Sequence, residues 1–269
     1  KLRLTVVIES TYGDMDSTDE KCKPILVNRI SQAIKEDKKV IIPTFAMGRT
    51  QEVAYYLKSM QDQELLPKDV EIWQGGSSAR EITYRFMYNN LGLNPEMRRF
   101  LPKNYHFVLT KERNQVCENL LNSAKPSVII SPGGMASYGT VKTFINKAIE
   151  QDDVLIIFPG YCSRDSKGYE LINTSKGSKI QYGGYTQTLN CDVTVSGEIS
   201  AHAKRDDLLS FLKNMAEPKS ILINHGETDV KLKFSNYLRD KFSPKTKIEV
   251  FNPDYAYSID SNGIFDIYA

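Results

Sequence analysis

Short apolar runs without polar alternation recur along the first two thirds of the chain, at 40–42, 128–130 and 154–158. Between them, apolar residues return at the three- and four-residue spacing of a helix, as they do over 24–37. Apolar runs separated by helices predict parallel strands that are covered on both faces. Residues 15–165 are therefore predicted to form an α/β layer structure, with its loops gathered at one end of the sheet.

The pattern changes after this region. Residues 177–195 alternate β-favouring and polar positions, which predicts antiparallel strands. The stretch 91–104 is polar and irregular. The other predicted strands are 1–8, 70–73, 220–224, 248–251 and 264–268. Two further helices are predicted to follow the turns at 44–52 and 131–139, and they run to about 60 and through 149. The remaining predicted helices are 79–89, with Ser78 as its N-cap, 205–215 and 229–242.

Composition narrows the class of protein. The chain has 269 residues, of which 41% are hydrophobic and 25% charged, as in folded globular proteins. A net charge of +2 gives no overall field for nucleic acid, so such a site would have to be a local patch. The four cysteines form no Cys-x-x-Cys pair, which argues against a cysteine-rich zinc module or a disulfide scaffold. Since no apolar run reaches 18 residues, no membrane span is predicted.

The chain begins within a predicted strand, with no initiator methionine and no signal peptide. We therefore expect it to be a fragment of a longer protein.

Two of only three histidines, His202 and His225, follow apolar stretches and flank an amphipathic helix. Glu9 stands at the end of the opening strand, where open α/β folds keep functional groups. A pair of hydrogen-bonded loop histidines, and a glutamate that accepts bonds from loop amides, are the alternatives. His106, between two aromatic residues, is predicted to be structural or at the surface.

Two glycine-containing turns, 43–52 and 131–139, each lie between a buried strand and a helix. This geometry points backbone N–H groups and a helix dipole at an anion. Arg49 could add a bidentate phosphate contact. A simple strand-to-helix turn is the alternative at either place.

Taken together, these stretches resemble the β-CASP branch of the metallo-β-lactamase superfamily, which includes the endonuclease subunit of the mRNA 3′-end cleavage machinery and RNase J. The match runs in order over almost the whole chain. It consists of Glu-Ser-Thr-Tyr-Gly at 9–13 (motif A), Pro-Thr-Phe-Ala-Met-Gly-Arg-Thr-Gln-Glu at 43–52, Ser-Pro-Gly-Gly-Met at 131–135 with Gly139, Gly-Tyr at 160–161, Ser-Ala-His at 200–202 (motif B) and His-Gly-Glu at 225–227 (motif C).

The resemblance implies an α/β fold: the C-terminal half of a metallo-β-lactamase αββα sandwich, formed by 1–13 and 190–269, with a β-CASP domain of mainly parallel sheet inserted at 14–189. It also implies a ribonuclease that hydrolyses phosphodiester bonds with hydroxide activated by two zinc ions. His225 would be a zinc ligand. His202 would be the general acid, or would stabilise the phosphorane. Glu9 would orient that imidazole and favour its protonated form.

The resemblance further implies RNA or phosphate contacts in the glycine-containing turns. A histidine at motif C is typical of RNA-processing members, whereas DNA-processing relatives tend to carry valine, so RNA is the expected partner. The residues expected to make these contacts are Arg49, Gln51, Ser131, Gly133, Gly134 and Met135.

Two departures from the family pattern qualify this. The family's His-x-His-x-Asp-His ligand cluster lies upstream of motif A, so this chain alone is expected to be inactive, with zinc absent or partial, and to need the missing N-terminal half as a partner. Lys204 stands where relatives often have an acidic residue, and Tyr169 where they often have arginine.

Several expectations stay open. The alternative function is a non-catalytic RNA-binding subunit or pseudoenzyme, and a third is a hydrolase that acts on a small molecule. We expect a protein without membrane contacts, cytoplasmic or, as a eukaryotic 3′-end processing homologue, nuclear. It could form a homo-oligomer.

Overall fold

The computed structural model describes residues 4–16, 25–88, 99–261 and 265–268. The chain divides into two compact units, each of which is treated by itself. The small unit comprises Lys1–Lys21 and Ala201–Ala269, and the large unit comprises Cys22–Ser200. The domain boundaries predicted from the sequence, with an insertion at 14–189, stay a prediction.

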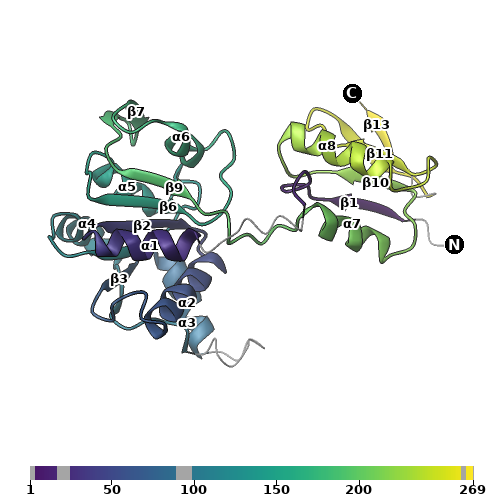
Figure 1. Cartoon of the computed structure of the whole chain (residues 1–269). Coiled ribbons are helices and arrows are strands. Elements are labelled where there is room, and N and C mark those ends of the chain that lie inside the picture. Colours follow the sequence, from purple (N-terminus) through teal and green to yellow (C-terminus); the bar gives the residue numbers. More distant parts are fainter. Residues whose placement is uncertain (1–3, 17–24, 89–98, 262–264, 269) are drawn as a thin grey trace. The chain divides into compact units, whose positions relative to one another are not determined.

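The large unit is built on a parallel sheet (Figure 1). Over the described residues its order is β4-β3-β5-β2-β6-β9, and every neighbouring pair is parallel. The strands are β2 (Lys39–Thr44), β3 (Glu71–Gln74), β4 (Tyr105–Phe107), β5 (Ser127–Pro132), β6 (Val154–Phe158) and β9 (Asp192–Val195). A small antiparallel pair, β7 (Lys179–Tyr182) and β8 (Tyr185–Thr188), lies outside this sheet.

Helices cover both faces of this sheet. They are α1 (Ile25–Lys35), α2 (Arg49–Asp62), α3 (Ser77–Tyr88), α4 (Arg113–Leu121), α5 (Val141–Ala148) and α6 (Lys167–Asn173), with a short 3-10 turn at Thr110–Glu112 before α4. Alternate residues of one strand enter different cores: Ile41 packs with the α4–α5 side, and Val40 and Ile42 with the α1–α2 side. Because successive strand side chains point to opposite faces, an unbroken apolar run marks a strand covered on both.

The small unit has a second parallel sheet of order β1-β10-β11 among its described residues. Its strands are β1 (Thr5–Ile8), β10 (Ser220–Ile223) and β11 (Lys247–Val250), and β12 (Ala256–Ile259) and β13 (Phe265–Tyr268) form an antiparallel pair. Apolar residues of helices α7 (Arg205–Lys213) and α8 (Thr228–Arg239) join β1 and β10 in one core.

The structure corrects several expectations. Only β7 and β8 of 177–195 are antiparallel, whereas β9 joins the large sheet in parallel as an edge strand. Edge strands are partly exposed, so they alternate in polarity like a half-buried antiparallel strand. Ser78 lies inside α3 and cannot be its N-cap. The sequence patterns also missed β4, α4, α6 and β12. Parts of five predicted segments lie outside the described residues, namely 1–3, 24, 89, 91–98 and 264.

No helix in the described ranges is long and apolar enough to cross a membrane.

Candidate active site

Glu9 directly follows β1, and its carboxylate is held by the adjacent turn and by one distant segment of the small unit. One oxygen, Oε2, accepts a hydrogen bond from the backbone N–H of Thr11 at 2.8 Å and lies 3.2 Å from Nδ1 of His202. The other, Oε1, accepts the N–H of Ala203 at 3.3 Å. The carboxylate therefore joins motif A to motif B and fixes which ring nitrogen of His202 faces it. The Glu9 carboxylate therefore accepts hydrogen bonds from loop amides and also faces the histidine, so the two alternatives given for Glu9 occur together.

His202 lies between two other rings. It stacks on His225 with ring centroids 5.2 Å apart and an interplanar angle of 27°, and Tyr12 meets it edge-on at 6.3 Å. The side chain is 39% exposed, so a solvent-borne substrate could reach the ring. Glu9, His202 and His225, which are far apart in sequence, are thus neighbours in the small unit.

Strand pairing brings His225 to this place. Because β1 and β10 are parallel with Ile8 opposite Ile223, their carboxyl ends meet at one edge of the sheet. The N–H of Ser10 donates to the carbonyl of His225 at 2.8 Å. His225 has a φ of 42°, a left-handed conformation that costs a non-glycine residue roughly 1–3 kcal/mol. Strained residues of this kind cluster at functional sites.

Gly226 allows this close approach. Its φ is 149°, and a Cβ there would lie 2.8 Å from Oγ of Ser10 and 3.1 Å from the Ser10 backbone. Ser10 is fully buried and its hydroxyl faces the carbonyl oxygens of Asn224 and His225 at 3.2 and 3.3 Å. The glycine of motif C is therefore required for contact between the ends of β1 and β10.

Residues after motif B are anchored as well. The N–H of Arg205 donates to the carbonyl of Met15 at 3.0 Å, and its guanidinium pairs with Asp16 at 2.9 Å. The same guanidinium lies 4.6 Å above the ring centroid of Tyr237. Lys204, one of the departures from the family pattern, forms a backbone bridge with Tyr12. The sequence analysis did not predict these contacts of Tyr12 and Arg205. Tyr12 could have been singled out, because it lies within motif A.

The residues expected to contact phosphate belong to the large unit, at the carboxyl ends of β2 and β5. Arg49 is the first residue of α2. Its side chain is 12% exposed and lies 3.7 Å from the carboxylate of Glu52. Burial raises the pKa of Glu52 more than the charge of Arg49 lowers it. Arg49 is therefore placed at the turn before α2, with a carboxylate already beside its guanidinium.

Gln51 and Ser131 are placed differently from the prediction. Gln51 is 1% exposed, and its amide donates to the hydroxyl of Thr83 at 2.9 Å, which in turn donates to Gln74 at 3.0 Å. Ser131 is fully buried. Direct phosphate contacts by these two side chains do not fit this burial. The amide of Gln51 bonds Thr83 inside the unit, and Oγ of Ser131 is buried with no hydrogen-bond partner among the described residues.

The loop after β5 is closed on itself by glycine. Gly133 has a φ of 122°, and a Cβ there would lie 2.1 Å from the carbonyl oxygen of Tyr138. The carbonyl of Met135 accepts the N–H of Gly168 at 2.7 Å, which ties the loop to α6. Gly134 packs under the ring of Phe45, where a Cβ would come within 3.1 Å. Gly133, Gly134 and Met135 therefore form a compact turn at the carboxyl end of the sheet.

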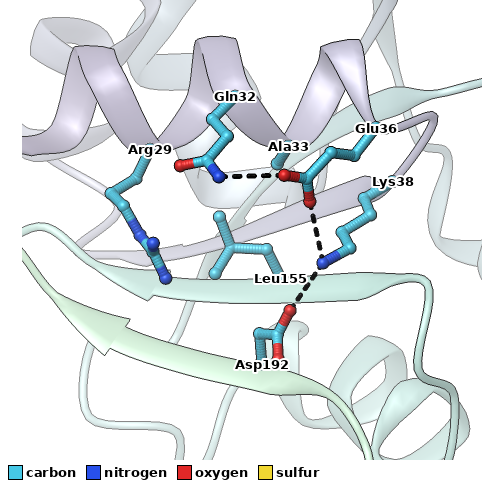
Figure 2. A pocket seen from close by; sticks show the side chains of 7 residues that line it. All are labelled: Arg29, Gln32, Ala33, Glu36, Lys38, Leu155 and Asp192. Carbon is cyan, nitrogen blue, oxygen red and sulfur yellow. Dashed lines mark hydrogen bonds and ion pairs between the residues drawn. The ribbon is translucent and has the colours of Figure 1, made fainter.

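A polar hollow of about 290 Å³ lies between α1 and β9 (Figure 2). Lys38 joins Glu36 at 3.0 Å to Asp192 at 2.7 Å, and Lys176 also bonds Asp192 at 2.8 Å. Arg29 points into the hollow from α1. Its lining cations are matched by carboxylates, so the arrangement ties the edge strand to the helix and leaves no excess of positive charge.

Zinc needs three or more protein ligands at a catalytic site. No group of three or more His, Cys, Asp or Glu residues that could hold a metal occurs in the described parts of the chain. His225 by itself does not make such a site, and the described residues do not fit zinc on their own. His106, the third histidine, stacks on Trp73 at 4.7 Å and bonds Asn104 at 2.8 Å, which agrees with its predicted structural role.

Comparison with known sequence families identifies the class of protein. Residues 50–171 match the Beta-Casp domain, and residues 187–253 match the Zn-dependent metallo-hydrolase RNA specificity domain. The chain belongs to the β-CASP family of the metallo-β-lactamase superfamily. The predicted family is confirmed, and so is the predicted fold class: mixed α/β with mainly parallel sheets flanked by helices, in a metallo-β-lactamase-type fold.

Similar individual proteins come from archaea and vertebrates. An RNase J-like protein of Methanocaldococcus jannaschii is 28% identical over 86% of this chain and 53% of its own length. Integrator complex subunit 11 of Danio rerio is 25% identical over 92% of this chain and 40% of its own length. Transcription termination factor FttA of M. jannaschii is 26% identical over 91% and 40%. The chain thus spans about half or less of the length of these relatives.

Proposed function

We propose that the natural protein containing this chain is a metal-dependent ribonuclease, and that Glu9, His202 and His225 belong to its active site. The observation that carries the proposal is the cluster itself: a carboxylate bonded to one imidazole, which stacks on a second imidazole, at the carboxyl edge of a parallel sheet. The RNA specificity domain match and the RNase J-like relative support RNA as the substrate class.

In this proposal His202 is the general acid. Water or hydroxide adds to the phosphorus atom, the bond from phosphorus to the leaving oxygen breaks, and His202 gives its proton to that oxygen. Glu9 faces Nδ1, so the other ring nitrogen, Nε2, is the one directed to substrate. The two backbone N–H bonds to Glu9 keep the carboxylate, and through it the ring, in one orientation. Glu9 is thus a positioning residue and His202 the catalytic one.

His225 is proposed as one metal ligand, whose companion ligands come from outside the described residues. Bound zinc would supply an activated hydroxide. The proposed site would hold two zinc ions, and a segment outside the described residues would supply the remaining ligands. The strained backbone of His225 fits such a role, because a fixed orientation of the ring is required of a ligand.

The test is cleavage of a single-stranded RNA by the full natural protein containing this chain, under single-turnover conditions with zinc and after chelation. His202→Ala is expected to slow cleavage by about 10²–10⁴-fold, the usual contribution of a general acid. RNA affinity should change little. His106→Ala is the matched control, since it removes the remaining histidine and touches Trp73 instead of Glu9.

Two results would contradict the proposal. Unchanged turnover in His202→Ala would remove this side chain from the mechanism. RNA binding with no cleavage in the wild-type protein, zinc present, would assign it to the non-catalytic RNA-binding class instead.

A further inference from the structure

An open hollow of about 370 Å³ lies on the large unit between the first turns of α4 and α5. Its volume is within the range of small-ligand sites, about 300–1,000 Å³. Basic and neutral polar side chains make up most of its wall. These include Arg113, Asn114, Lys142, Thr143 and Asn146, and the backbone of Gly183 closes one side.

The hollow carries excess positive charge. Lys147, at its rim, is matched by Glu118 through an ion pair. Arg113 and Lys142 form no ion pair with any residue that the structure describes. Neither α4 nor α5 has an acidic residue in its first turn. The hollow beside α1 differs, because there the lysine lies between two carboxylates.

Arg113 also has an unused donor. Its Nε is buried and has no hydrogen-bond partner among the described residues. A buried donor left without a partner costs free energy, about 1–3 kcal/mol. Guanidinium groups match the geometry of phosphate and carboxylate oxygens, so an anion is the ligand that suits a hollow lined by Arg113 and Lys142.

The far wall is a close contact between Gly183 and Asn146. Gly183 has a φ of 64°, and a Cβ there would lie 2.0 Å from Oδ1 of Asn146, so a side chain at this turn would be strained and would displace that of Asn146. Oδ1 of Asn146 accepts the amide of Gln187 at 2.8 Å, which leaves the Asn146 NH₂ group as the donating end of the side chain. The wall therefore adds a further donor beside Arg113 and Lys142.

We propose that this hollow binds a phosphate of the RNA backbone, through Arg113 and Lys142, as a subsite outside the Glu9–His202 cluster. The proposal rests on the proposed ribonuclease function for the identity of the polyanion. Gly139, in the same wall, belongs to the loop after β5 that was expected to bind phosphate. The subsite would therefore extend the anion-binding edge of the large unit from that loop onto α4 and α5. Since it would bind phosphate and touch no base edge, it would favour no base sequence.

The test uses the full natural protein and a single-stranded RNA, with binding measured at several salt concentrations. The double variant Arg113→Gln with Lys142→Gln should weaken binding roughly tenfold. The slope of log affinity against log salt should flatten by about 0.7 for each phosphate that the variant no longer neutralises. The matched control is Lys68→Gln with Lys125→Gln. It removes the same charge from exposed positions that precede β3 and β5, at the amino ends of these strands.

A second measurement needs no variant. Titration of the wild-type protein with inorganic phosphate should shift the Nε–Hε NMR signal of Arg113, and a signal that does not move overturns an anion site here. Equal salt slopes in the double variant and the control, with normal wild-type RNA binding, overturn the subsite alone. If the wild-type protein binds no RNA at all, both this proposal and the proposed ribonuclease function are overturned.

Discussion

Replacement of Gly226 by alanine perturbs the contact between motif C and the end of β1. The added Cβ would lie 2.8 Å from Oγ of Ser10 and 3.1 Å from its backbone carbon and oxygen. Ser10 is fully buried and its N–H holds the carbonyl of His225. Since the obstructing atoms are mainly backbone, they cannot rotate away, and the segment carrying His225 has to move.

The expected cost has two parts. A φ of 149° is a conformation that L side chains rarely adopt, and holding alanine there costs roughly 1–3 kcal/mol. Overpacking against Ser10 adds roughly 1–3 kcal/mol more. The control is Gly177→Ala, because Gly177 has a φ of 86° with nothing within 4 Å of its added Cβ. That variant should lose about 1–2 kcal/mol from backbone strain only.

Hydrogen exchange followed by mass spectrometry measures both variants, since it reports local opening free energies for peptides of each unit. Gly226→Ala should lower protection of β1 and β10 by about 2–6 kcal/mol. Gly177→Ala should affect only the large unit. Equal, small losses in the two variants would show that the site beside Ser10 tolerates a side chain, and the close approach inferred for motif C would be wrong.

Two further predictions concern the large unit. Burial raises the pKa of Asp192, but hydrogen bonds from its two lysine partners outweigh this effect and hold the pKa below its ordinary value. The stability that Asp192 contributes is therefore present at neutral pH and disappears as the pH falls through that lowered pKa. In urea unfolding, Asp192→Asn should lose on the order of 1 kcal/mol at pH 7 and almost nothing well below about pH 4, and an equal loss at both pH values would contradict this. Burial raises the pKa of the Cys117 thiol to about 11 and those of Cys162 and Cys191 to about 12; iodoacetamide at pH 8 should therefore alkylate them only after unfolding, and rapid labelling of the native protein would show that they are open to solvent.

Much of the fold could be predicted because burial leaves a direct pattern in the sequence. β2, β5 and β6 each contain an unbroken apolar run, and both of their faces are covered. β9 could not be assigned in this way. It lies at the sheet edge, where partial exposure produces the alternation of an antiparallel strand, and its parallel pairing with β6 depends on a partner more than thirty residues away.

The candidate site was only partly predictable. Motifs identified Glu9, His202 and His225, because each is a polar residue at the end of an apolar stretch. Gln51 shows the limit: its place in the family motif implied a phosphate contact, but Thr83 and Gln74 provide the partners that let it lie in the core. Which way a polar side chain faces depends on such distant partners, which sequence spacing does not reveal. The hollow at Arg113 was missed for the same reason.

The most direct test of the active-site account is a double-mutant cycle on Glu9 and His202 in the full natural protein, with zinc-dependent RNA cleavage as the readout. Because Glu9 acts by orienting the His202 ring, Glu9→Gln should slow cleavage at least about tenfold in the wild-type background. In the His202→Ala background, the same change should alter the rate by less than about twofold. If the two effects multiply instead, the carboxylate acts independently of the imidazole, and the Glu9–His202 pair is not the acid of the reaction.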